Sequence, residues 1–209
     1  MRVSGWKSAA IAGVAVAGIA VFLSAAPKPP RVPTAALAAP EITLELDPAQ
    51  SKLHYSVDST LHTVHGTFNL KGGAVHFDPE SGNAGGEIGA YATSGESGND
   101  SRDEKMHKEI LESQKYPDLA FRPLQVEGKV ERVGVSDVKL RGVMLLHGKE
   151  HELAVPVHAE LAADHWKGTT RFEVPYIQWG LKDPSNWLLK VKPVVHIELE
   201  MAGKARSGQ

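Results

Sequence analysis

The chain has 209 residues, of which 42% are hydrophobic and 23% charged, a balance typical of a folded globular domain. Its 23 Lys and Arg residues nearly balance 25 Asp and Glu residues, so the formal net charge of -2 provides no basic footprint for nucleic acid. The chain contains no cysteine, which excludes disulfides, zinc–thiolate sites, iron–sulfur clusters, cysteine nucleophiles and a cysteine-linked lipid anchor.

The first 40 residues have the composition of an export signal followed by a linker. Arg2 and Lys7 precede an apolar run from Ala9 to Leu23, which is shorter than the roughly 18–20 residues that a permanent membrane helix requires. Small residues after this run offer cleavage sites, and a linker rich in proline and alanine follows. We therefore predict a signal peptide and a periplasmic or secreted domain. The alternative is an uncleaved signal-anchor that holds the same domain at a membrane.

From residue 41 onward, apolar and polar residues alternate, as they do in antiparallel strands that cover one interior. The alternation is regular over residues 42–46, 53–57, 63–70, 151–161 and 191–201. No second domain boundary stands out. We predict one domain over residues 41–203, followed by a disordered tail over residues 204–209.

One stretch, residues 94–115, breaks the alternation and indicates a short helix. Ser101 followed by Glu104 has the pattern of a capping box at a helix start. Met106 and Ile110 then recur at helical spacing. The helix therefore interrupts a chain that otherwise consists of strands.

A tight hairpin is predicted at Gly148-Lys149, a two-residue turn with glycine first. In the expected register Leu146 faces His151. Met144 then faces Leu153, and the apolar faces of both strands coincide. These elements together predict an all-β fold, an elongated antiparallel β-barrel of about eight or more strands with one short α-helix.

Seven short motifs, in this order, resemble the bacterial YceI-like family over about residues 41–203. They are LDPAQS (46–51), VHGTFNL (64–70), VHFDP (75–79), NDSRD (99–103), KYPDLAF (115–121), GVMLLHG (142–148) and LAVPV (153–157). The resemblance implies an exported, lipocalin-like barrel that holds a long lipid chain in its interior. The lipid would be an isoprenoid, a quinone or a fatty-acid-like molecule, bound without any further cofactor.

A bound chain requires an interior too wide for the barrel's own side chains to fill. The residues expected to line such a cavity were chosen for inward strand parity or aromatic character. They are Phe68, Phe77, Met106, Phe121, Leu140, Met144, Leu153, Val155, Val157, Phe172 and Trp179.

The ten histidines are expected at the surface or rim, with no metal site and no catalytic residue. His62 and His65 would lie on opposite faces of a strand. His147 and His151 have the spacing of zinc ligands on a helix, but the predicted hairpin places them across a turn. An enzyme with a histidine-bound metal is therefore the least favoured hypothesis.

The segment from Trp179 to Trp187 fits either an ordinary packed corner or the rim of a cavity mouth. As a rim, it would meet an incoming lipid or make transient contact with a membrane. The rival hypothesis for function is an envelope stress or structural protein with a closed barrel, which docks another protein through this corner. Nucleic acid is not expected as a partner. The family resemblance adds a homodimer to the expectations, although no residue pattern identifies an interface.

Overall fold

The structure, a computed structural model, describes residues 41–208, so the predicted leader lies outside the described residues. Ten strands run in chain order: β1 (Ile42–Leu46), β2 (Lys52–Asp58), β3 (Thr63–Phe68), β4 (Leu70–Phe77), β5 (Ala84–Tyr91), β6 (Asp118–Glu127), β7 (Gly134–Leu146), β8 (Lys149–Leu161), β9 (His165–Val174) and β10 (Val195–Ser207). The helix α1 (Asp100–Lys105) lies between β5 and β6 and continues as a π-helical segment, η3 (Met106–Ile110). Two 3₁₀ turns are η1 (Pro48–Gln50) and η2 (Ala92–Ser94). None of the helices within residues 41–208 has the length and hydropathy to span a bilayer.

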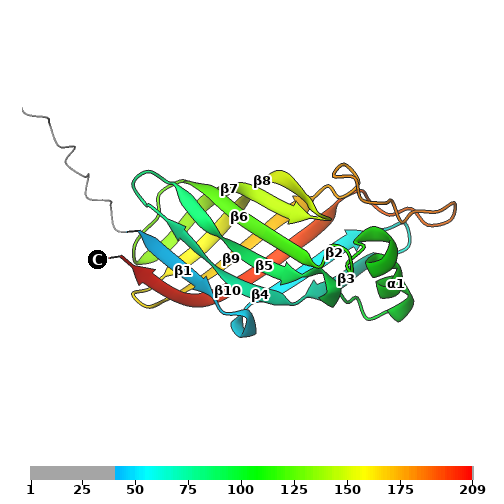
Figure 1. Cartoon of the computed structure of the whole chain (residues 1–209), viewed down its shortest axis with the longest axis horizontal. Coiled ribbons are helices and arrows are strands. Elements are labelled where there is room, and N and C mark those ends of the chain that lie inside the picture. Colours follow the sequence, from blue (N-terminus) through cyan, green and yellow to red (C-terminus); the bar gives the residue numbers. More distant parts are fainter. Residues whose placement is uncertain (1–40, 209) are drawn as a thin grey trace, which may run out of the picture. The chain divides into compact units, whose positions relative to one another are not determined.

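The strands form one antiparallel sheet that closes on itself, because β1 pairs with both β4 and β10 (Figure 1). The strands β1 and β2 pair with consecutive parts of β10, while β4 and β3 pair with β1 and β2. The strands β1 and β2 therefore act together as one interrupted strand, and β3 and β4 act together as another. Counted in this way, the wall consists of eight strands in up-and-down order. The predicted antiparallel barrel with one short α-helix is confirmed.

The predicted disordered tail is wrong for residues 204–207, which belong to β10. These residues pair with β1, from Lys204 opposite Glu45 to Ser207 opposite Ile42. Ala205 points inward and is only 8% exposed. The prediction failed because a four-residue run shows little alternation by itself, whereas in the fold its backbone hydrogen bonds close the barrel.

The hairpin between β7 and β8 is present, but its register differs from the prediction by two residues. The turn consists of His147 and Gly148, whose φ angles of 53° and 71° suit a type I′ turn. Met144 consequently pairs with His151 rather than with Leu153. A shift by two residues leaves every side chain on the same face of the sheet, so the apolar pattern satisfies both registers.

The helix α1 begins after Asn99, not after the predicted cap Ser101. The Asn99 side-chain oxygen accepts a hydrogen bond from the backbone N–H of Arg102 at 3.0 Å. Asn99 has the extended backbone that a capping residue needs, with φ -140° and ψ 107°, whereas Ser101 already lies within the helix. The capping-box prediction therefore placed the helix start two residues too late.

Replacing Asn99 with Ala should lower the free energy of unfolding by about 1 kcal/mol, because the N–H of Arg102 loses its partner. Replacing Ser101 with Ala should change it by less than about 0.5 kcal/mol, as is usual for an exposed helical position. Urea denaturation of both variants measures the two values. Equal losses would show that Asn99 is not the cap.

The barrel interior is packed at the end where β1 meets the last residues of β10. We call this group the packed cluster, and its members include Ile42, Leu44, Phe77, Val155, Val157, Leu161, Trp166 and Met201. The indole N–H of Trp166 donates to the carbonyl oxygen of Glu45 at 3.0 Å, so the ring is buried without an unpaired donor. Burial of each such side chain contributes about 1.5–3 kcal/mol. The packed cluster closes this end of the barrel.

Candidate functional site

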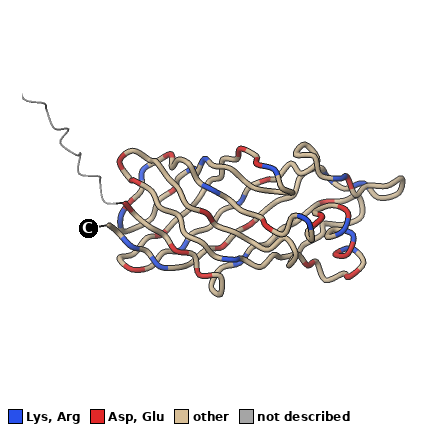
Figure 2. The backbone as a smooth tube through the Cα atoms, viewed as in Figure 1, with Lys and Arg blue, Asp and Glu red and all other residues tan. Residues whose placement is uncertain are grey.

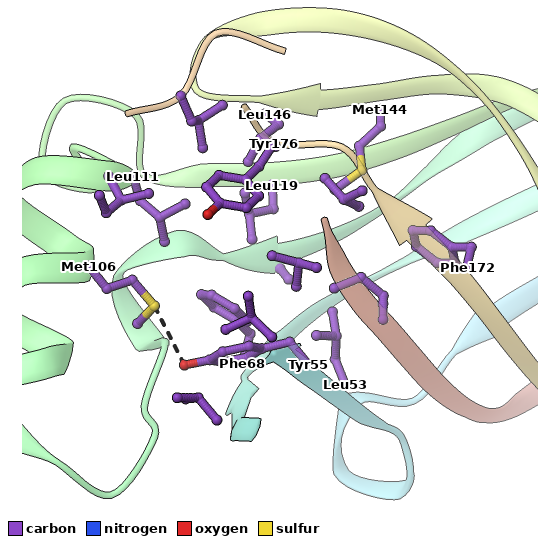
Figure 3. Close-up of a pocket in the computed structure, with 18 of the residues that line it drawn as sticks. Leu53, Tyr55, Phe68, Met106, Leu111, Leu119, Met144, Leu146, Phe172 and Tyr176 are labelled. Atoms are coloured by element: carbon purple, nitrogen blue, oxygen red, sulfur yellow. Dashed lines mark hydrogen bonds between the residues drawn. The ribbon is translucent and has the colours of Figure 1, made fainter. Parts of the chain in front are cut away.

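A cavity of about 430 Å³ lies inside the barrel, beyond the packed cluster and toward the end that carries α1 (Figures 1 and 3). Strands β2, β3, β4, β5, β6, β7, β9 and β10 supply its walls, and α1, η3 and the segment before β10 supply its rim. The side chains labelled in Figure 3 are Leu53, Tyr55, Phe68, Met106, Leu111, Leu119, Met144, Leu146, Phe172 and Tyr176. The walls are therefore almost entirely aliphatic or aromatic.

Part of this wall is a second apolar group, which we call the rim cluster, made of the buried residues Leu146, Val174, Tyr176 and Leu181. Ile110 and Leu111 from the helical segment pack against it. The rim cluster therefore joins the ends of β7 and β9 to the helical segment. Its side chains pack beside the cavity and do not fill it.

Five residues selected from the sequence line this cavity: Phe68, Met106, Phe121, Met144 and Phe172. They come from four strands and the helical segment, and the fold brings them around one space. Their contact with a ligand stays a prediction.

The other six selected residues lie elsewhere. Phe77, Val155 and Val157 belong to the packed cluster, and Leu140 and Leu153 pack against it. These five do point inward, but neighbouring side chains fill the barrel at their level. Trp179 also does not line the cavity. Its ring stacks on His151, with centroids 4.3 Å apart and planes 5° apart.

Several lining residues were missed although the alternation contained the signal. Leu53, Tyr55 and Val57 share one strand face, as do Ile197 and Leu199, and all five line the cavity. Their inward parity was readable, but the sequence did not show at which level the barrel is hollow. Tyr176 carried no such signal, because it follows β9 in an irregular segment.

The charged side chains at the cavity come from α1 and are basic. Arg102 and Lys105 line the rim, and no Asp or Glu is found among the described residues that line it. Arg102 donates through Nε and Nη2 to Ser97, at 2.7 Å to the hydroxyl and 3.0 Å to the carbonyl oxygen. The Asp103 carboxylate accepts from the backbone N–H of Ser97 at 3.0 Å. These bonds tie the loop before α1 to the helix and so fix the helix over the cavity.

Two further groups near the rim have shifted pKa values. Burial tends to raise the pKa of Asp103, but hydrogen bonds from Ser97 and the charge of Arg102 outweigh it, so the pKa lies below the usual value. Burial, aided by the charge of Asp103, raises the pKa of Tyr55. The Tyr55 hydroxyl donates to the sulfur of Met106 at 3.6 Å (Figure 3). Tyr55 therefore remains a neutral wall residue at physiological pH.

The histidines are spread over the barrel. His147 contacts the carboxylate of Glu112 at 2.6 Å, and His107 contacts Ser113 and the carbonyl oxygen of Gly95. Within residues 41–208, no three His, Asp or Glu side chains are arranged to hold a metal ion. On the outside of the barrel, basic and acidic residues are interspersed along the strands (Figure 2).

An exposed apolar tip adjoins the cavity. It consists of Leu61, Trp187 and Leu188, which are 71%, 90% and 67% exposed. Two loops carry these residues, and they are joined by a hydrogen bond from the N–H of Thr60 to the carbonyl oxygen of Lys190 at 2.9 Å.

The loops that carry the tip also supply part of the cavity rim. Ser59 and His62 come from the first loop, and Leu189 and Val191 come from the second. The two loops lie at the end of the barrel that carries α1 (Figure 1). The two tryptophans of the predicted corner thus differ, since Trp179 is packed against His151 and Trp187 is exposed beside the cavity mouth.

Comparison with known proteins identifies similarity at the level of family and fold. A family model described as YceI-like domain matches residues 44–202. A search of curated proteins finds no match.

Three solved structures share the fold. Burkholderia cenocepacia BcnA is 15% identical, with a TM-score of 0.61 over 76% of this chain and 99% of that chain. A polyisoprenoid binding domain from Saccharophagus degradans, implicated in plant cell wall breakdown, is 13% identical, with a TM-score of 0.57 over 78% and 98%. The Campylobacter jejuni YceI protein is 15% identical, with a TM-score of 0.50 over 66% and 83%.

Proposed function

The chain belongs to the YceI-like family, and from this premise we propose that it is an exported, non-catalytic protein that binds a long apolar lipid inside its barrel. The observation that carries the proposal is the cavity of about 430 Å³, lined by apolar side chains within a closed barrel. The polyisoprenoid binding domain from Saccharophagus degradans, which has the same fold, supports an isoprenoid as the lipid class.

The size of the cavity suits part of a chain rather than a compact polar metabolite. Each CH₂ group moved from water into an apolar site contributes about 0.8 kcal/mol. About ten buried carbons would therefore contribute about 8 kcal/mol, enough to exceed the lower estimates of the cost of association. The scarcity of polar groups in the wall favours a ligand whose buried part is hydrocarbon.

The proposal includes transient membrane contact through the apolar tip. Leu61, Trp187 and Leu188 are exposed beside the cavity mouth, and Lys190 and Lys192 stand on the same segment. Apolar side chains next to lysines are suited to the surface of an anionic bilayer. A lipid that leaves the bilayer at this point would reach the cavity without crossing bulk water. Location outside the cytoplasm is part of the same proposal, supported by the composition of residues 1–40.

Native mass spectrometry of the exported domain tests the binding proposal. The protein purified from its own cells should carry one long-chain species per chain, and solvent extraction should release it for identification. Incubation of stripped protein with membrane lipids should restore the same mass shift. A protein that stays free of lipid after both treatments would contradict the proposal and favour the alternative of a protein-docking barrel.

A further inference from the structure

Tyr176 carries a buried hydroxyl that no group in the described chain satisfies. The residue follows β9, is 5% exposed and forms part of both the rim cluster and the cavity wall. Its backbone is fixed on both sides, because its N–H donates to Val174 at 2.9 Å and its carbonyl oxygen accepts from Leu181 at 3.0 Å. Among residues 41–208, no hydrogen-bond partner reaches its hydroxyl oxygen. Figure 3 shows this oxygen pointing into the space enclosed by the labelled side chains.

The second tyrosine of the same wall provides a contrast. The hydroxyl of Tyr55 already has a partner in the sulfur of Met106, at 3.6 Å. Buried hydroxyls in folded proteins are nearly always paired, since an unpaired one loses its hydrogen bonds to water without replacement. Of the two wall tyrosines, Tyr176 is therefore the one whose buried hydroxyl is available to a bound molecule.

Resting on the proposed function, we propose that the Tyr176 hydroxyl donates a hydrogen bond to an uncharged oxygen acceptor of the bound lipid, such as a ketone or quinone carbonyl. The lipid is thereby a chain that carries a carbonyl-type oxygen rather than a pure hydrocarbon. Its oxygen sits near the rim cluster, and its hydrocarbon part extends along Phe172 toward the packed cluster.

The surroundings of the hydroxyl decide the kind of acceptor. Burial, together with the charge of Asp183, raises the pKa of Tyr176 to about 12. The group therefore keeps its proton at physiological pH and acts as a donor. Its neighbours in the rim cluster are aliphatic, and an anionic head group placed there would lose its hydration without gaining a cation. The basic residues Arg102 and Lys105 belong to α1 and are not members of the rim cluster, so they are not among the side chains that pack around Tyr176 there.

Two matched probes test this inference: the isoprenoid ketone phytone and the hydrocarbon pristane, which has a methyl branch where phytone has its carbonyl oxygen. Their affinities are measured by displacement of the fluorescent apolar probe N-phenyl-1-naphthylamine, whose own affinity is determined for each variant. Tyr176→Phe should weaken phytone binding about tenfold, the loss of one buried hydrogen bond, and leave pristane binding unchanged. Tyr55→Phe is the matched control, and it should preserve the ratio of the two affinities.

The thermal midpoint of ligand-free Tyr176→Phe should equal or exceed that of the wild type, because the variant no longer buries an unpaired hydroxyl. Equal weakening of phytone and pristane by Tyr176→Phe would overturn the inference, and so would a selective loss of phytone in Tyr55→Phe alone. A marked fall in the thermal midpoint would also overturn it, since the hydroxyl would then have a partner within the protein. A wild-type protein that binds neither probe would overturn the proposed function, and this inference with it.

Discussion

Met144→Trp is expected to weaken lipid binding by at least about tenfold while the barrel remains folded. Met144 lies on β7, lines the cavity and packs against the rim cluster. A tryptophan at this position would project into the cavity and occupy volume that a lipid chain needs. Displacement of N-phenyl-1-naphthylamine by phytone measures the affinity, and circular dichroism with thermal unfolding confirms the fold.

Two control variants separate filling of the cavity from general damage. Met144→Leu keeps an apolar side chain of similar volume and should bind phytone like the wild type. Val143→Trp adds the same indole at the next position of β7, which faces the outside of the barrel by strand parity, and should also bind normally. If Met144→Trp binds phytone with wild-type affinity, the lipid does not occupy the space beside Met144.

Trp187→Ser combined with Leu188→Ser is expected to reduce association with vesicles of phosphatidylcholine and phosphatidylglycerol by at least about tenfold. Both side chains are exposed on the apolar tip, so their replacement should remove membrane affinity without changing the packed cluster or the cavity wall. Cosedimentation with vesicles measures association. Added salt should weaken the wild-type interaction, because screening reduces the attraction between Lys190, Lys192 and the anionic lipid.

The matched control replaces two exposed valines, Val133 just before β7 and Val135 within it, which are 68% and 53% exposed. The Val133→Ser, Val135→Ser variant loses two exposed apolar side chains outside the tip and should bind vesicles like the wild type. Unchanged vesicle binding in the tip variant would contradict membrane contact. If that variant instead loses a stoichiometric envelope protein, the tip is a protein-docking surface and the alternative function holds.

The strand pattern of this protein was readable from the sequence because side-chain direction in a strand has a period of two residues. Leu53, Tyr55 and Val57 could be assigned to one face before any tertiary contact was known. The same property explains the error in the β7–β8 hairpin. Its two registers differ by two residues and place identical side chains inside, so only the left-handed backbone of His147 and Gly148 distinguishes them.

The position of the candidate site along the barrel was decided by the tertiary structure alone. Phe68 and Phe77 are both inward aromatic residues of consecutive strands, yet the first lines the cavity and the second lies in the packed cluster. The difference depends on which side chains face each residue across the interior, and strand parity does not contain that information. The two tryptophans of the predicted corner also have different environments that the sequence did not distinguish. Trp179 is stacked on His151, and Trp187 is exposed.

The sequence by itself therefore determined the family, the all-β architecture and many of the inward-facing strand residues, because these follow from local periodicity and from motifs in order. The tertiary structure decided where the barrel is filled and where it is hollow, and that the hydroxyl of Tyr176 faces the hollow part. Packing is a property of residues far apart in the chain, so its outcome becomes defined only when the eight strands of the wall are in place.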